Sequence, residues 1–363
     1  MRIAAQGLTA FVCCISFLGF AQETTPPAQA PPLVERPGTA PEHEKGRRIE
    51  IDVVVTDKAG APVSGLQPQD FTLLDDKQPQ KVLSFAAFDE TNAATAPPQQ
   101  VILVVDAVNT SYGTMGTERL QLDKLLHSGG QLPVPTSFVF LTDTHTQIQP
   151  TPSRDGNVLA GILDSNQAGL RIVGRSQGFY GAAERVQLSI RALDQLIAYE
   201  AKQPGRKLVI WLSPGWALLS GPNIDLTAKD QEVLFNTVVQ LSAALRAARI
   251  TLYSVDPLGM SEAGSGRTFY YQEFLKGVPS AKKVQNGNLG LQVLAAQSGG
   301  RVLNSSNDVA GLIASCLADA KAFYSISFDA PRADHPNEYH SLEIKIGKPG
   351  LAARTRTGYY AQP

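Results

Sequence analysis

The sequence predicts an α/β fold: a doubly wound, mostly parallel sheet with a small β module built from both chain ends. Three observations lead to this prediction. Continuous apolar runs such as "VILVV" at residues 101–105 alternate with helical stretches, which is typical of a parallel sheet covered on both faces. Strands that alternate apolar and polar residues occur near both ends of the chain. The 363 residues also exceed one typical domain of about 100–200 residues, so a second module is expected.

Composition indicates a globular protein and argues against one class of partner. Apolar residues make up 43% of the chain and charged residues 18%, which is far from the composition of a disordered protein. The formal net charge is −1, so nothing in the charge balance indicates a nucleic-acid partner. No nucleic acid is expected to bind.

The first 21 residues resemble a cleavable secretory signal. Arg2 supplies the positive start, "LTAFVCCISFLGFA" the apolar core, and Gly19 with Ala21 the small residues before a cleavage point. A membrane anchor is the alternative, but the apolar run is shorter than the roughly 20 residues that a spanning helix needs. We therefore expect cleavage near Ala21 and Gln22, no membrane span afterwards, and a secreted or periplasmic protein.

Residues 22–46 are rich in Pro and Ala and contain almost no large apolar side chain, so they predict a disordered tether. Cys13 and Cys14 lie inside the signal segment, which leaves Cys316 in the mature chain. A lone cysteine in an apolar helical pattern is more often a small buried hydrophobe than a nucleophile.

An N-terminal β unit is predicted over residues 47–90. Apolar residues at 49, 51, 53 and 55 alternate with Glu50 and Asp52, as a half-buried strand requires. The following stretch "DFTLLDDKQPQKVLSFAAF" predicts two strands joined by a polar turn at residues 75–80. A polar loop then marks the boundary with the next domain.

The predicted α/β domain covers residues 100–321. Its strands are "VILVVD", "SFVFLTD", "KLVIWLS", "ITLYSVD" and a short "GRVLN". Leu234, Val238, Leu241 and Leu245 recur at four and three residues and predict a helix capped by Thr227. A second stripe at residues 186, 190, 193 and 197 predicts a helix before "KLVIWLS", and another helix is expected to begin near residue 117.

Residues 322–361 return to β structure. The three expected strands lie in "FYSISFD", "HSLEIKIGKP" and "LAARTRTGYY". Together with the N-terminal unit they would form one module that joins both ends of the chain.

Several stretches, in order along the chain, resemble the VWFA-related family of acidobacterial type, secreted proteins with a von Willebrand factor type A domain. They are "VVVTDKAGAPVSGLQPQDFTLLDDKQPQKVLSF", "VILVVDAVNTS", "QPGRKLVIWLSPGW", "ARITLYSVDPLGM", "LAAQSGGRVLNSSNDVAGL" and "ARTRTGYY". The resemblance implies a Rossmann-like sheet with helices on both sides. It also implies a protein that binds macromolecules rather than one that catalyses a reaction.

The same resemblance implies a metal-ion-dependent adhesion site at the carboxyl ends of the strands, built from hard oxygen ligands. Asp106 matches the acid of its D-x-S-x-S motif and Thr110 the second hydroxyl, but Val108 stands where the first Ser belongs. Ser213 and Pro214 replace the start of a later "TDG", so a second carboxylate is missing. The sequence therefore predicts a degraded site.

Asp106, Thr110, Ser111 and Ser213 remain as candidate ligands, and Mg²⁺ or another divalent cation would bind them weakly. We expect no cofactor. The favoured interpretation of Asp106 is structural: a strand-end acid accepts hydrogen bonds from the N–H groups of the following turn. Thr110 or Ser111 would then cap the next helix.

One catalytic pattern is present. "GRSQG" at residues 174–178 fits the nucleophile elbow G-x-S-x-G, with Ser176 followed by Asp256 and by His335 or His340. The elbow needs a firm strand directly before the serine and a helix directly after it, and the sequence predicts neither. A serine hydrolase is therefore the less favoured alternative, and we expect no enzyme.

The sequence favours a secreted, non-enzymatic binding protein of the adhesion type that recognises a protein partner through loops at the strand ends. The candidate contact residues are Asn109, Tyr112, Trp216, Tyr270 and Tyr271. The alternative within non-enzymatic proteins is a structural part of an envelope assembly.

Overall fold

In a computed structural model, the described residues are 48–89, 91, 96–127, 130–166, 178–216, 226–257, 271–304 and 306–363. The predicted signal segment and the predicted tether lie outside them. Among the described residues, no helix combines the length and the apolar character needed to cross a lipid bilayer.

A seven-stranded sheet forms the centre of the α/β part, in the order β11-β10-β9-β5-β6-β7, with β8 pairing on β6. The parallel strands are β5 (Gln99–Asp106), β6 (Gln131–Leu141), β9 (Arg206–Leu212), β10 (Ile250–Val255) and β11 (Val302–Leu303). The short strands β7 (Thr146–Ile148) and β8 (Ser153–Asp155) run antiparallel to β6. The strand order reverses between β5 and β9, and such a switch point is where open α/β sheets bind ligands.

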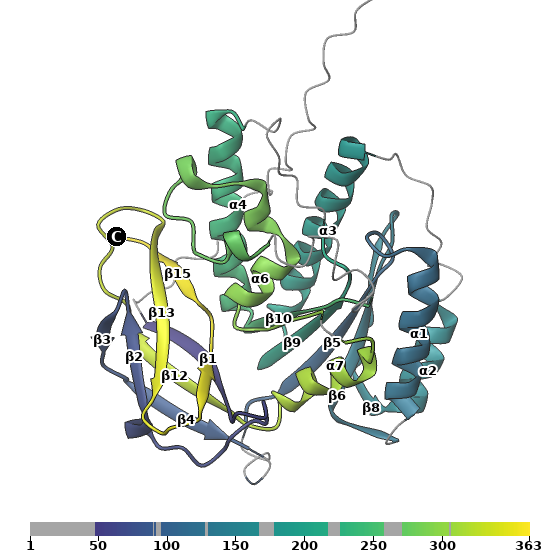
Figure 1. Ribbon diagram of the computed structural model, residues 1–363, viewed down its shortest axis with the longest axis horizontal. Helices are drawn as coiled ribbons and strands as arrows, with labels where there is room; N and C mark the ends of the chain where they lie inside the picture. Colours follow the sequence, from purple (N-terminus) through teal and green to yellow (C-terminus); the bar gives the residue numbers. More distant parts are fainter. Residues whose placement is uncertain are drawn as a thin grey trace, which may run out of the picture. The chain divides into compact units, whose positions relative to one another are not determined.

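Helices cover both faces of this sheet (Figure 1). One face carries α1 (Tyr112–His127), α2 (Gly156–Ser165) and α7 (Val309–Ala318), and the other carries α3 (Gly178–Glu200), α4 (Ala228–Ala247) and α6 (Leu291–Gln297). Along β5, Ile102 and Val104 enter one apolar core, whereas Val101, Leu103 and Val105 enter the other. The predicted doubly wound α/β fold is therefore confirmed.

The helix caps show how the sequence sets the helix ends. Thr227 caps α4 as predicted, because its Oγ1 accepts a hydrogen bond from the Asp230 N–H at 3.2 Å and Asp230 bonds back to Thr227. The prediction for α1 was wrong, since this helix begins at Tyr112 and not near residue 117. Ser111 is its cap, with Oγ 3.3 Å from the Thr114 N–H. Gly113 and Gly116 in the first turns hid the helical pattern.

The β module consists of two four-stranded antiparallel sheets. One has the order β14-β1-β12-β4, with β14 (Ala352–Arg354), β1 (Arg48–Thr56), β12 (Phe323–Asp329) and β4 (Ser84–Phe88). The other has the order β15-β13-β2-β3, with β15 (Gly358–Ala361), β13 (Glu338–Ile346), β2 (Phe71–Asp75) and β3 (Gln78–Gln80). Each sheet pairs N-terminal strands with C-terminal ones, which confirms a module built from both chain ends.

Two strand predictions in this module were wrong. The polar turn is not residues 75–80 but only Asp76 and Lys77, both at positive φ, as two-residue hairpins favour, and β3 follows directly. "LAARTRTGYY" is not one strand but two, β14 and β15, because the chain crosses from one sheet to the other between them. The remaining short helices are η1 (Pro68–Asp70), η4 (Tyr271–Phe274), η5 (Ala281–Lys283) and η6 (Asn286–Leu289).

Candidate functional site

Asp106 is the last residue of β5, at the switch point of the sheet, and it is fully buried. Its Oδ1 accepts hydrogen bonds from the backbone N–H groups of Val108 and Asn109, both at 3.0 Å. Its Oδ2 accepts from Asn109 Nδ2 at 2.8 Å and from Trp211 Nε1 at 2.9 Å. Donors therefore face both oxygens of the carboxylate. The interpretation of Asp106 as the acceptor for its own turn is confirmed.

The charge of Asp106 is balanced only by dipoles. Burial raises the pKa of Asp106, and hydrogen bonds from Trp211, Asn109 and Ser213 offset part of that rise. None of these donors carries a net charge.

Of the other predicted ligands, Ser213 contacts Asp106, and it does so as a hydrogen-bond donor. Thr110 is buried, and its Oγ1 has no hydrogen-bond partner among the described residues. Ser111 is exposed and caps α1, and the buried Ser213 accepts a hydrogen bond from the Gly215 N–H at 3.2 Å. A divalent cation needs free oxygen ligands, whereas the oxygens of Asp106 face N–H donors. This donor set does not fit a Mg²⁺ ion.

Glu118 is a buried acid beside this site that sequence reasoning missed. It lies on α1 with no solvent exposure, and neither of its carboxyl oxygens has a partner among the residues described. Burial raises its pKa well above the usual value, and the nearby negative charge of Asp106 raises it further. The sequence could have predicted that Glu118 is buried. Glu118 follows Met115 by three residues and precedes Leu122 by four, so the three share one apolar helix face.

The predicted contact residues divide into surface and core. Tyr112 is 77% exposed at the start of α1, and Leu120 is 70% exposed two turns further along the same helix. Asn109 is half-buried, with its amide nitrogen between Asp106 and Ser189.

The aromatic candidates also differ from one another in how exposed their side chains are. Trp216 is only 3% exposed and packs edge-to-face on Trp211 at 5.2 Å, so it anchors the core instead of presenting a surface. The apolar run that precedes it in sequence forms the buried strand β9. Tyr271 is half-buried in η4, and Tyr270 lies outside the described residues.

The residues of the hydrolase pattern are distributed over different parts of the fold. Ser176 lies outside the described residues. His335 is exposed, and Asp256 directly follows β10. His340, the other candidate base, is buried on β13 and pairs with Asp75 of the β module rather than with Asp256.

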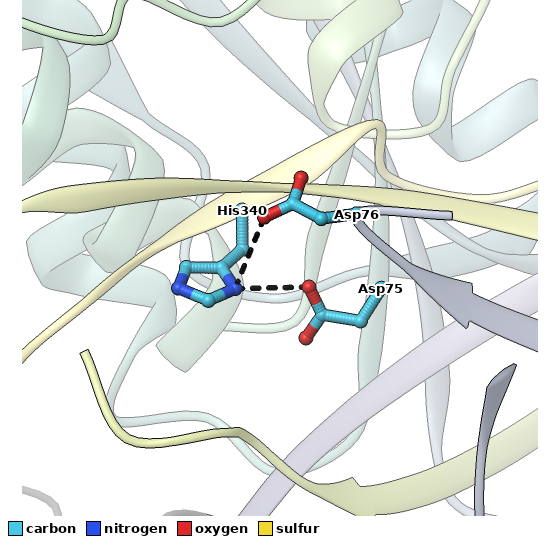
Figure 2. Close-up of side chains that lie close together, drawn as sticks. All are labelled: Asp75, Asp76 and His340. Carbon is cyan, nitrogen blue, oxygen red and sulfur yellow. Dashed lines mark hydrogen bonds and ion pairs between the residues drawn. The ribbon is translucent and has the colours of Figure 1, made fainter. Parts of the chain in front are cut away.

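His340, Asp75 and Asp76 form a close group of titratable side chains in the β module (Figure 2). His340 Nδ1 lies 2.9 Å from Asp75 Oδ1 and 3.5 Å from Asp76 Oδ2. The Tyr359 hydroxyl donates to Asp75 Oδ2 at 2.5 Å, and the Ser341 N–H donates to Asp76 Oδ1 at 2.9 Å. Each carboxylate is thus oriented by a second donor while its other oxygen faces the imidazole.

Backbone geometry makes this group possible. Successive side chains of a strand point to opposite faces, but Asp76 has φ 46° and leaves the strand, so its carboxylate lies beside His340 together with that of Asp75. One ligand atom from each residue lies within 4.8 Å of the others, a spacing that a metal ion could use. A hydrogen bond from Nδ1–H to Asp75 accounts for the same distance. Sequence reasoning missed the group because His340 and Asp75 are 265 positions apart.

Neither a family model nor a curated protein matches the sequence. Among solved structures, the chain is similar to the human COPII-coat protein Sec24c, at 10% identity and a TM-score of 0.32, over 74% of this chain and 44% of that one. It is also similar to the manganese-loaded Plasmodium vivax TRAP protein, at 10% identity and a TM-score of 0.32, over 78% of this chain and 100% of that one. The chain spans less than half the length of Sec24c. These likenesses are too low to assign a family or an activity, so the fold assignment rests on the strand order and the helix placement.

Proposed function

We propose that this protein is an exported, non-enzymatic binding protein that recognises a protein partner at the carboxyl edge of its parallel sheet. The observation that carries the proposal is the exposed apolar face of α1, where Tyr112 is 77% and Leu120 is 70% exposed, directly beside the switch point. Tyr is a frequent anchor of protein interfaces, and both side chains are available to a partner.

In this proposal the partner is bound without a bridging metal ion. The adhesion site implied by the resemblance to the VWFA-related family needs a carboxylate that is free to hold an ion. Both oxygens of Asp106 instead accept hydrogen bonds from its own chain. Affinity would come from burial of Tyr112 and Leu120 rather than from coordination.

Capture of partners from the secreting cell tests the proposal. Tagged protein that begins at Gln22 would be incubated with envelope and culture-medium fractions, and bound proteins would be identified by mass spectrometry. The same capture with Tyr112→Ala is expected to lose the partner. Leu83→Ala is the matched control, because Leu83 is an exposed apolar residue of the β module at 39% exposure. Equal capture by all three proteins would place the contact elsewhere.

Calorimetry tests the ion-free part of the proposal. Titration with Mg²⁺, Mn²⁺ and Ca²⁺ is expected to give millimolar binding or none. If heat is released, the variants Asp106→Asn and His340→Asn identify the site. Loss of binding in Asp106→Asn would place the ion at the end of β5, whereas loss in His340→Asn would place it in the β module. Tight binding that Asp106→Asn abolishes would contradict the ion-free mechanism, and ester hydrolysis that Ser176→Ala abolishes would contradict the non-enzymatic one.

A further inference from the structure

Two carboxylates converge on one imidazole nitrogen in the β module (Figure 2). His340 Nδ1 lies 2.9 Å from Asp75 Oδ1 and 3.5 Å from Asp76 Oδ2. A hydrogen on Nδ1 can be donated to Asp75, but the oxygen of Asp76 lies beyond the usual N–H···O range of about 2.7–3.2 Å. A hydrogen bond therefore accounts for the position of only one of the two carboxylates.

The three ligand atoms have the spacing of a metal coordination shell. They all lie within 4.8 Å of one another. Zn²⁺ binds imidazole nitrogen and carboxylate oxygen at about 2.0–2.2 Å, so neighbouring ligands of a tetrahedral or octahedral ion are about 2.9–3.5 Å apart. Both distances from His340 Nδ1 fall in this range. A metal ion between the three atoms would contact all of them at once, which a proton on Nδ1 cannot do.

Neighbouring groups hold each carboxylate in an orientation that suits metal binding. The Tyr359 hydroxyl donates to Asp75 Oδ2 at 2.5 Å. Ser341 donates to Asp76 Oδ1 from its backbone N–H at 2.9 Å and from its hydroxyl at 2.8 Å. These donors engage one oxygen of each acid, so that the other oxygen faces His340. Carboxylates that ligate a metal are typically fixed by such hydrogen bonds to their second oxygen.

The imidazole is buried, and its one engaged nitrogen points at the two acids. His340 is 6% exposed, and its Nε2 has no hydrogen-bond partner among the residues that the structure describes. The ring stacks on Tyr359 with 5.2 Å between the centroids, which fixes the direction of Nδ1. The side chain of Asp76 is 51% exposed. An ion would therefore be reached from solvent beside Asp76, and water would complete its coordination, as in zinc sites with three protein ligands.

We propose that His340, Asp75 and Asp76 bind one Zn²⁺ ion. The imidazole decides the class of metal, because Mg²⁺ and Ca²⁺ prefer oxygen ligands alone, whereas Zn²⁺ binds nitrogen and oxygen. Affinity for a site of this kind also rises from Mn²⁺ to Zn²⁺. The site is therefore compatible with weak binding of Mg²⁺, Mn²⁺ and Ca²⁺. It lies in the β module and does not depend on the partner surface proposed for α1.

The three ligands come from opposite ends of the chain. Asp75 is the last residue of β2 and Asp76 follows in the turn to β3, whereas His340 lies on β13. The ion would cross-link β2 and β13, which already pair with each other, at the end of their ladder. The unfolded chain does not hold these residues together, so zinc would bind the folded protein preferentially and stabilise it.

Zinc calorimetry on the chain that begins at Gln22 tests the site, after metal has been removed with EDTA and the chelator dialysed away. The protein is expected to bind one Zn²⁺ ion with a micromolar Kd. Asp76→Asn, at a half-exposed side chain that the fold does not need, should weaken binding at least about tenfold. His340→Asn should abolish it. His335→Asn is the matched control, because His335 is an exposed histidine in the loop before β13, and it should keep the affinity.

Two measurements on the unaltered protein decide the case even if His340→Asn does not fold. Zinc at about one hundred times the Kd is expected to raise Tm by about 3–6 °C. Crystals grown with zinc are expected to show an anomalous peak at the zinc edge between His340 Nδ1 and the two carboxylates. Binding only at millimolar zinc, an unchanged Tm or a peak elsewhere would overturn the proposal. Full affinity in Asp76→Asn, or its loss in His335→Asn, would overturn it as well, because the ion would then lie at another site.

Discussion

Asp106 and Asp75 are two buried aspartates, each the last residue of a strand, and their surroundings differ in kind. Asp106, at the end of β5, is held by backbone N–H groups, an amide and an indole, all of which keep their protons at any ordinary pH. Asp75, at the end of β2, is held by the imidazole of His340 and the phenol of Tyr359, which come from two distant strands. The first carboxylate shapes a local turn, whereas the second ties two ends of the chain together.

Asp106 and Asp75 have different roles although both end a strand. Three hydrogen bonds to Asp106 come from Val108 and Asn109, within the three residues after it, so this part of the site forms as soon as the turn forms. The donors to Asp75 lie on β13 and β15, so its site exists only after both chain ends have paired. Variants at Asp106 and at Asp75 therefore separate a site made by one turn from a site made by both chain ends.

The largest effect is expected from Asp106→Ala. It leaves buried donors of Trp211 and of the following turn without an acceptor, and the free energy of unfolding should fall by about 3–5 kcal/mol. Urea unfolding followed by tryptophan fluorescence measures it. Asp57→Ala is the control, because Asp57 also accepts two backbone N–H groups but in an exposed turn, and it should cost only about 1 kcal/mol. Equal losses in both variants would mean that burial of the Asp106 network contributes nothing.

A smaller loss is expected from Asp75→Asn. The amide replaces a charged acceptor of His340 and Tyr359, so the free energy of unfolding should fall by about 1.5–3 kcal/mol. Asp76→Asn is the matched variant, because Asp76 contacts the same imidazole but its side chain is 51% exposed, and it should cost less than about 1 kcal/mol. If Asp76→Asn proved the costlier of the two, the exposed acid and not the buried one would hold the imidazole.

Glu118→Gln tests the pH dependence of the buried acid beside Asp106. The folded-state pKa of Glu118 is raised, so wild-type stability is fully present below the ordinary Glu pKa and falls as pH rises from there through the raised value. Glutamine does not titrate, so the variant should gain stability relative to wild type by about 1.4 kcal/mol for each unit by which the pKa is raised.

Urea midpoints of wild type and Glu118→Gln at pH 4.5 and pH 8 measure this gain. Glu343→Gln, at a carboxylate that is 57% exposed, serves as control and should show the same difference from wild type at both pH values. A Glu118→Gln difference that does not grow with pH would mean that Glu118 titrates normally.

The smallest effect on stability is expected from Tyr112→Ala. Because Tyr112 is largely exposed, the free energy of unfolding should change by less than about 0.5 kcal/mol, as thermal unfolding would show. A larger loss would indicate that Tyr112 packs within its own chain, and a loss of partner capture would then not identify a contact surface.

Local patterns gave the α/β part of the fold. Each central strand is a continuous apolar run, and each long helix has its own apolar stripe, so neither depends on distant residues for recognition. The capping box of Thr227 and Asp230 likewise involves only four consecutive residues, so the sequence alone indicates it. The start of α1 was misplaced because Gly113 and Gly116 weaken the local helical signal, although Ser111 caps it.

The sequence by itself determined the fold class, the pairing of the chain ends and the role of Asp106, because its turn donors lie within three residues and Val108 already stood in place of a ligand. Only the tertiary structure decided which acids meet which bases. Asp75 and His340 are brought together by the pairing of β2 with β13, two strands from opposite ends of the chain. Trp216 became a core residue for the same reason, since only the packed fold determines which aromatic rings remain exposed.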